Sequence, residues 1–179
     1  MEFSELLEER RSVRKYEHGT SITKDEIMQM VYAAQQAPSW KNSQSGRYYA
    51  VLSSDFAEQL RCVCLPGFNR ESTDGAAAYI VTTFKGGNAG FRSDGTPTDS
   101  LGNGWGAYDL GLQTENLILK ARELGYDTLI MGLRDEKNLR EMLSIPEDEI
   151  MVAVIAVGKR ATDPEKPIRN SIDEILKVF

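Results

Sequence analysis

Histidine is almost absent from this chain of 179 residues, because His18 is the only one. A metal site built from several histidines is therefore excluded, and we predict no metal site. A Ser-His-Asp or Cys-His system would have to use this one side chain, which lies beside Gly19 in an expected turn. If the protein is an enzyme, a bound cofactor is expected to carry the chemistry, without a catalytic side chain of the chain itself.

Long apolar runs are also missing, and no basic-then-apolar leader opens the sequence. No stretch reaches the roughly 20 apolar residues of a membrane-spanning helix, so we expect a cytoplasmic protein without a membrane partner. A formal net charge of −6 and a pI near 5.0 argue against a nucleic-acid surface. A hydrophobic content of 41% and a charged content of 27% are ordinary, and we expect a single domain over residues 1–179.

Two familiar nucleotide-binding signatures are missing, and cysteine is scarce. Neither G-x-G-x-x-G nor G-x-x-x-x-G-K-[ST] occurs, so we set aside a Rossmann site and a P-loop. The two cysteines, Cys62 and Cys64, lie too close along the chain to bridge easily and have no second pair with which to bind zinc. We expect plain thiols.

Cations are concentrated near the start of the chain, in Arg10-Arg11-Ser12-Val13-Arg14-Lys15-Tyr16. If this segment is extended, its side chains alternate, so Arg10, Ser12 and Arg14 point the same way. Two guanidinium groups with a hydroxyl between them suit a phosphate or a polyhydroxyl chain. The other interpretation is a basic end that offsets the dipole of the acidic helix expected over residues 2–9, or that faces solvent.

Helical and extended patterns are mixed without a regular βαβ alternation, which predicts an α+β layered domain. Helices are expected over residues 2–9, 24–36, 55–64 and 107–124, after Asp135 and from Ser171, and strands over 47–53, 77–84, 128–131 and 150–157. The last strand is an unbroken apolar run, which is typical of a strand buried on both faces. The stretch Gly86–Gly106 holds seven of the 15 glycines and is typical of a functional lid or a disordered loop.

The helix expected over residues 107–124 is the longest, and its leucines form stripes on two faces. Such a helix is expected at the centre of the fold or in a subunit interface. Gln113 and Asn116 interrupt the apolar pattern, and two interpretations are open: they face solvent, or they serve a site.

Four motifs, in this order, resemble those of the FMN-dependent nitroreductase family. Arg10–Tyr16 is similar to R-R-S-x-R-x-[FY], Ala37–Gln44 to A-P-S-x-x-N-x-Q, Gly111–Leu117 to G-x-x-x-x-N-[LM], and Lys166–Arg169 to a C-terminal K/R segment. They span nearly the whole chain, and the resemblance depends on their order and spacing. One departure is Gly158-Lys159-Arg160, where the family often has Gly-Tyr-Pro.

The resemblance implies a three-layer α/β/α sandwich with a mixed, mostly antiparallel sheet and a long central helix in a dimer interface. It implies a homodimer that holds FMN between its subunits. NADH or NADPH would reduce the FMN, and a nitroaromatic, a quinone or an enone would then take the electrons in a ping-pong mechanism. The Gly86–Gly106 stretch is where we expect differences in the substrate pocket.

The resemblance also implies roles for residues at matching positions. The phosphate, ribityl chain and pyrimidine edge would be held by Arg10, Ser12 and Arg14, with contacts from Arg11 and completed by Arg169 with Lys159 or Lys166. The other subunit would contribute Pro38, Ser39, Trp40 and Asn42. The ring system would lie near Gln113 and against Met131, Gly132 and Leu133.

Two other functions stay open. The same fold could carry out specialised flavin chemistry, such as reductive dehalogenation or flavin fragmentation, or act as a flavin-binding redox sensor. From another class, the chain could be a non-enzymatic dimeric module that binds a different phosphorylated ligand.

Overall fold

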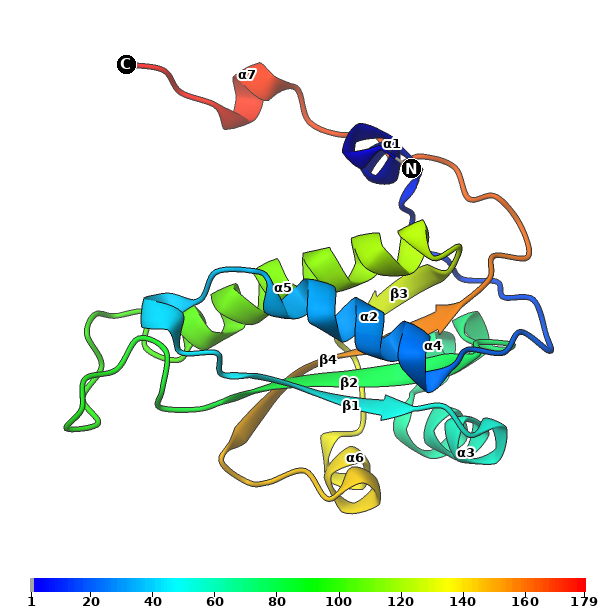
Figure 1. The fold of residues 1–179 in the computed structure, drawn as a ribbon, viewed down its shortest axis with the longest axis horizontal. Coiled ribbons are helices and arrows are strands. Elements are labelled where there is room, and N and C mark those ends of the chain that lie inside the picture. The colour runs from blue at the N-terminus through cyan, green and yellow to red at the C-terminus, as the bar shows by residue number, and fades with distance from the viewer. Residues whose placement is uncertain (1) are drawn as a thin grey trace.

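The computed structural model describes residues 2–179 and has helices on both faces of one sheet (Figure 1). The helices are α1 (Phe3–Glu9), α2 (Lys24–Gln35), the 3₁₀ helix η1 (Trp40–Asn42), α3 (Ser54–Cys64), α4 (Gly67–Ser72), α5 (Gly104–Glu123), α6 (Glu136–Leu143) and α7 (Ile172–Ile175). The strands are β1 (Gly46–Val51), β2 (Ala78–Lys85), β3 (Asp127–Met131) and β4 (Glu149–Gly158). No helix within residues 2–179 is long and apolar enough to cross a membrane.

The four strands form one sheet in the order β1-β2-β4-β3, and each neighbouring pair is antiparallel. An isolated parallel bridge between Ser12 and Thr128 lays the N-terminal segment beside the edge strand β3. Parallel pairing is therefore confined to this bridge, and the sheet agrees with the expected mixed, mostly antiparallel arrangement.

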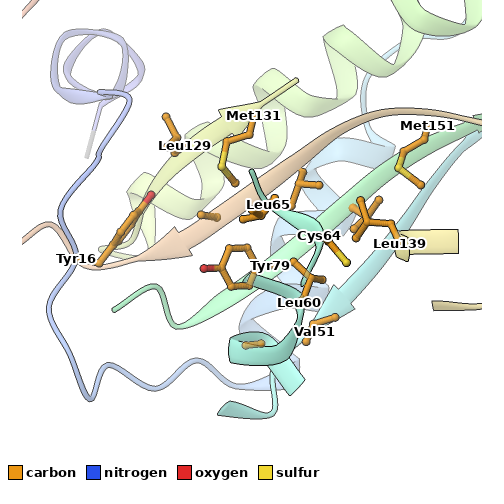
Figure 2. Packing of buried hydrophobic residues seen from close by; sticks show 14 of the residues in the cluster. Tyr16, Val51, Leu60, Cys64, Leu65, Tyr79, Leu129, Met131, Leu139 and Met151 are labelled. Carbon is orange, nitrogen blue, oxygen red and sulfur yellow. The ribbon is translucent and has the colours of Figure 1, made fainter. Parts of the chain in front are cut away.

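Successive side chains of a strand point to opposite faces of the sheet, so the four strands contribute side chains to two separate cores. One core lies between the sheet and α3 and α6, and includes Tyr79 of β2 and Leu129 and Met131 of β3 (Figure 2). The other lies between the sheet and α2 and α5, and includes Ile80 of β2 and Ile155 of β4. The expected three-layer α/β/α arrangement is thus confirmed.

The prediction for the last strand is only half right. Residues 153–158 of β4 are buried, but Ile150 is 38% exposed. The reason is that β3 pairs only with Val154–Gly158, so the first half of β4 has β2 on one side and no strand on the other. The first half of β4 is therefore an edge of the sheet.

The two cysteines are free thiols, as expected. Burial raises the pKa of Cys64 to about 11, so this thiol stays protonated near neutral pH. Cys62 is exposed, and its hydrogen bond to Glu58 raises the pKa of its thiol. Neither thiol has the lowered pKa of a reactive nucleophile.

Candidate functional site

The cation-rich segment is fixed along the outer edge of β3. The N–H of Val13 donates to the carbonyl of Thr128 at 3.0 Å, and the Val13 side chain is 1% exposed in the core that holds Leu129 and Met131. Further along, the N–H of Ala161 donates to the carbonyl of Lys15 at 2.9 Å. The segment is therefore extended, as expected, and is attached to the sheet at both ends.

The extended backbone decides which way the cations point. Because Val13 faces the core shared with α3 and α6, Ser12 and Arg14 face the opposite side of the sheet, toward the layer of α5. Both are exposed. Ile130 of β3 alternates with Leu129 and Met131, so it faces the same side, and it is 46% exposed. Cations and an exposed apolar side chain thus share one side of the edge strand.

The arginines of this segment have no carboxylate partners among residues 2–179, whereas five arginines elsewhere do. Arg10, Arg11 and Arg14 form no ion pair there, and the Arg14 guanidinium only donates to the Ser12 carbonyl at 3.3 Å. The arginines that do pair with carboxylates are Arg61, Arg122, Arg134, Arg140 and Arg160. Unpaired guanidinium groups beside an exposed hydroxyl can receive a phosphate dianion without first breaking an ion pair.

Arg11 has different surroundings from Ser12 and Arg14. It lines a pocket of about 400 Å³ together with Arg122, Arg160 and Asp163. Its Nε is buried without a hydrogen-bond partner, and its Nη1 donates to the carbonyl of Arg10 at 2.8 Å. Its predicted contact with a cofactor stays a prediction.

The other end of β3 is also fixed before any ligand binds. Arg134 donates to the Gly132 carbonyl and to the Met151 carbonyl, each at 2.6 Å. The Asn69 amide donates to the Leu133 carbonyl at 2.8 Å. Leu133 is 76% exposed, while Met131 is buried at 2%. Sequence reasoning missed Arg134 and Asn69, because Met151 and Leu133 lie 17 and 64 residues from them along the chain. It missed Ile130 because its exposure depends on the place of β3 at the edge of the sheet.

Exposed Ser12 and Arg14 and the exposed side chain of Ile130 therefore lie on one side of the edge strand, and the exposed Leu133 follows the far end of the strand. Thr128, beside Ser12, and Gly132 are four residues apart, which is about 13 Å along a strand. An elongated ligand with an anionic end and a flat apolar end fits this arrangement.

The loop over residues 38–44 lies elsewhere, at the N-terminal end of α5. Its Trp40 backbone N–H donates to the carboxylate of Asp109 at 2.8 Å, and the Trp40 ring lies 4.6 Å from the ring of Trp105, centroid to centroid. Pro38 and Asn42 are exposed, and the Ser39 hydroxyl accepts from the backbone N–H of Gln44 at 3.1 Å. No motif in the sequence marks Asp109 as a site residue.

Gln113 is buried, at 5% exposed, so the interpretation of solvent exposure is wrong for it. The Tyr48 hydroxyl donates to its Oε1 at 2.8 Å, and a Cβ on Gly46 would overlap that same oxygen. Gln113, Gly46 and Tyr48 line a cavity of 280 Å³ with Arg47. Asn116 is half-buried, and its amide donates to the carbonyl of Ala33 at 3.2 Å.

The cations predicted for the phosphate site near the C-terminus, Lys159, Lys166 and Arg169, do not form one cluster. Lys159 is exposed where the chain runs beside the N-terminal segment, since its carbonyl accepts from the N–H of Glu17 at 2.9 Å. Lys166 pairs with Glu8 of α1. Arg169 is exposed in the segment that leads to α7 (Figure 1).

The predicted site residues of one chain thus form two groups at opposite ends of α5. The loop group is attached through Asp109, and the cationic group lies near Arg122, which pairs with Glu9 at 2.9 Å. Thirteen residues of helix correspond to about 20 Å. Within residues 2–179, no group of three or more His, Cys, Asp or Glu side chains is placed to hold a metal ion.

Comparisons with known proteins agree on one family. The model of the nitroreductase family matches residues 7–159. "Putative NAD(P)H nitroreductase YdgI" of Bacillus subtilis is 26% identical, and the match covers 98% of this chain and 97% of that protein. A nitroreductase family protein from Streptococcus pneumoniae has a similar structure, with a TM-score of 0.84, 20% identity, and coverage of 99% of this chain and 100% of that one. An Exiguobacterium sibiricum protein, solved in complex with FMN, has a TM-score of 0.78 and 23% identity, with 100% and 98% covered.

Proposed function

The chain belongs to the nitroreductase family, and we propose that it is an FMN-dependent oxidoreductase that uses NADH or NADPH. When bound, FMN supplies the electron transfer from the nicotinamide to an electron-poor acceptor such as a nitroaromatic, a quinone or an enone, in a ping-pong mechanism. The observation that carries this proposal is the group of unpaired guanidinium groups at one end of β3, with exposed apolar side chains at its other end. An FMN complex is known for a protein of similar fold.

The chain's own residues would bind the two ends of the cofactor differently. Arg10, Ser12 and Arg14 would hold the phosphate and the ribityl chain, because charge-assisted hydrogen bonds from guanidinium groups match a phosphate. Arg14 would also stabilise negative charge on the pyrimidine edge. Arg169, with Lys159, would complete the phosphate site.

The apolar end would orient the ring and exclude water from it. Gly132 and Leu133 would present backbone N–H groups to the ring, and their segment is already held by Arg134 and Asn69. Ile130 is exposed on the side of the sheet that Ser12 and Arg14 face, so it would be covered by the ring. Burial of such apolar surface favours binding.

We propose that the working form is a homodimer, because the loop of one chain lies too far from its own cations. With about 20 Å of α5 between the two groups, the loop with Pro38, Ser39, Trp40 and Asn42 would contact the cofactor held by a second copy. The end of the chain supports this, since its apolar side chains are exposed: Ile168, Ile172, Ile175, Leu176, Val178 and Phe179. Several exposed apolar side chains in one short segment are typical of a contact with another chain.

The test is the visible spectrum of the purified protein, recorded without oxygen, before and after NADH or NADPH is added. We expect a yellow protein, or one that becomes yellow with added FMN, whose visible absorbance is bleached by a nicotinamide nucleotide. A second addition, of a quinone or a nitroaromatic, is expected to restore the colour. A bound flavin that neither nucleotide reduces would contradict the reductase and favour a redox sensor. A protein that stays colourless with excess FMN would contradict flavin binding and favour a module for another phosphorylated ligand.

A further inference from the structure

Asp109 of α5 is a buried carboxylate without a cation. It is 2% exposed and forms no ion pair with any residue over 2–179. Its Oδ2 accepts the backbone N–H of Trp40 at 2.8 Å and the hydroxyl of Ser43 at 3.4 Å. Removing a carboxylate from water is costly, and hydrogen bonds from neutral groups offset only part of that cost. The cost of burying this carboxylate without a cation is therefore not offset by an ion pair, and the segment that it holds is a candidate reason for it.

The segment that Asp109 contacts is strained. Lys41, Asn42 and Gln44 have φ values of 43°, 56° and 47°, which residues other than glycine rarely adopt. The strain is confined to a few residues: of the four such residues within 2–179, only Ser144 lies outside this loop. A backbone in this region persists only where its surroundings hold it.

Two residues of α5, one turn apart, hold the loop at Trp40. Trp105 and Asp109 are related by i and i+4, so they lie on the same face of the helix. The Trp105 ring packs against the Trp40 ring at 4.6 Å, and Asp109 binds the Trp40 backbone. The Trp105 indole N–H donates to the carboxylate of Asp99 at 3.0 Å, which fixes that ring in turn. The ring and the backbone of Trp40 are therefore held at once.

We propose that Asp109 is a positioning residue of the flavin site, which sets the 38–44 loop in its binding conformation before the cofactor arrives. The inference depends on the proposed function, since the loop would meet the flavin of a second copy. A loop that is already ordered loses less conformational freedom when the ligand binds, and so binds it more tightly. Asp109 need not touch the flavin to have this effect.

The experiment measures FMN affinity and the near-ultraviolet circular dichroism of the apo-protein in Asp109→Ala and Asp109→Asn. The dichroism reports the Trp40–Trp105 pair without any flavin. Asp109→Ala is expected to lower FMN affinity by about tenfold or more and to reduce the tryptophan signal, because the loop loses its anchor. Asp109→Asn is expected to keep most of both, since an amide oxygen still accepts the Trp40 N–H.

Glu149→Gln is the matched control. Glu149 is also buried, at 4% exposed, and also accepts two neutral donors, the Tyr49 hydroxyl at 2.8 Å and the Thr83 hydroxyl at 2.5 Å. It lies among residues of β1, β2 and β4 and contacts nothing in the 38–44 loop. This variant is expected to change stability without changing FMN affinity or the tryptophan signal.

The outcomes separate the positioning role from the proposed function. If the parent protein binds no FMN, the proposed function fails, and the tryptophan signal still tests whether Asp109 orders the loop. If the parent binds FMN and Asp109→Ala keeps parental affinity and signal, the positioning role is overturned. Loss of affinity in Asp109→Asn equal to that in Asp109→Ala would overturn it too, because the acceptor would not matter. Should Asp109→Ala fail to fold, Trp105→Leu removes the other contact to Trp40 and is expected to lower FMN affinity in the same direction; unchanged affinity would count against the inference.

Discussion

A buried aspartate lies near each end of α5, Asp127 at the start of β3 and Asp109 on the helix itself, and the two make different contacts. Asp127, at the C-terminal end, is 4% exposed and pairs with Arg160 at 2.5 Å and Arg122 at 3.3 Å. Asp109, near the N-terminal end, has only the Trp40 N–H and the Ser43 hydroxyl. The first holds together segments that are already in relaxed conformations, while the second contacts a strained loop. The difference indicates that Asp127 serves stability, while Asp109 serves the conformation of the loop.

The largest effect is expected from Asp127→Ala. Arg160 also donates to the Glu9 carbonyl at 3.2 Å, so the carboxylate joins β3, the N-terminal segment and the stretch after β4. Its removal would take the buried partner away from two partly buried guanidinium groups, which would keep only the exposed carboxylates of Glu9 and Asp163, at a cost of about 3 kcal/mol. Urea unfolding monitored by far-ultraviolet circular dichroism measures this. A loss no greater than that of an exposed carboxylate would remove the contrast between the two ends.

Arg14→Ala tests the cationic end in its proposed role. Loss of a charge-assisted hydrogen bond to the phosphate is expected to weaken FMN binding by about 1.5–3 kcal/mol, or roughly 10- to 100-fold. Because Arg14 is exposed and unpaired, stability without FMN should change little. Lys137→Ala, on α6 at the opposite face, removes the same charge and is the control for FMN titration of the apo-protein. Equal FMN affinity in the two variants would show that the phosphate is not bound here.

Gly46→Ala tests the packing between the start of β1 and α5. An added Cβ would overlap the Gln113 Oε1, which accepts the Tyr48 hydroxyl. Forcing these groups apart is expected to cost about 1–3 kcal/mol of stability. Thermal unfolding measures the loss, and the same change in a Gln113→Ala background should cost clearly less, because the overlapping atom is absent. An equal cost in both backgrounds would mean that Gly46 is needed for another reason.

Asp163→Asn should have the smallest effect, although Asp163 binds the same arginine as Asp127. Its carboxylate accepts from Arg160 at 2.6 Å, which holds the pKa of Asp163 below its usual value, yet it is solvent-exposed. A lowered pKa adds stability above the unfolded value of about 3.9, and this is lost as the pH falls through the folded value. The parent should therefore be slightly more stable than the variant at pH 7, and equal to it in acid. A large difference that persists in acid would contradict this origin.

Features that depend on neighbouring residues could be predicted from the sequence. The capping boxes of Thr23 with Glu26 and of Ser171 with Glu174 are present, and Val13 alternates with its exposed neighbours as an extended chain requires. The central helix and the strands follow from apolar patterns of the kind that local sequence carries, while the three layers are expected from the resemblance to the nitroreductase family.

Features that depend on distant partners could not be predicted in this way. Asp109 acquires its role from Trp40, 69 residues away, and Asp127 from Arg160, 33 residues away. The left-handed backbone at Lys41 and Asn42 has no glycine to mark it. Whether Gln113 is buried or exposed depends on the Tyr48 hydroxyl, which donates to it and lies 65 residues away.

The most direct test of a flavin site shared by two copies is complementation between two deficient variants. Arg14→Ala and Asp109→Ala are purified as apo-proteins, mixed in equal amounts under conditions that let subunits exchange, and titrated with FMN. If each site takes its cations from one copy and its loop from the other, random pairing should restore about a quarter of the tight sites of the parent, because half of the dimers would be mixed and each mixed dimer would have one intact site. If the mixture binds FMN only as the average of the two variants alone, the cations and the loop do not belong to one shared site, and the account is contradicted.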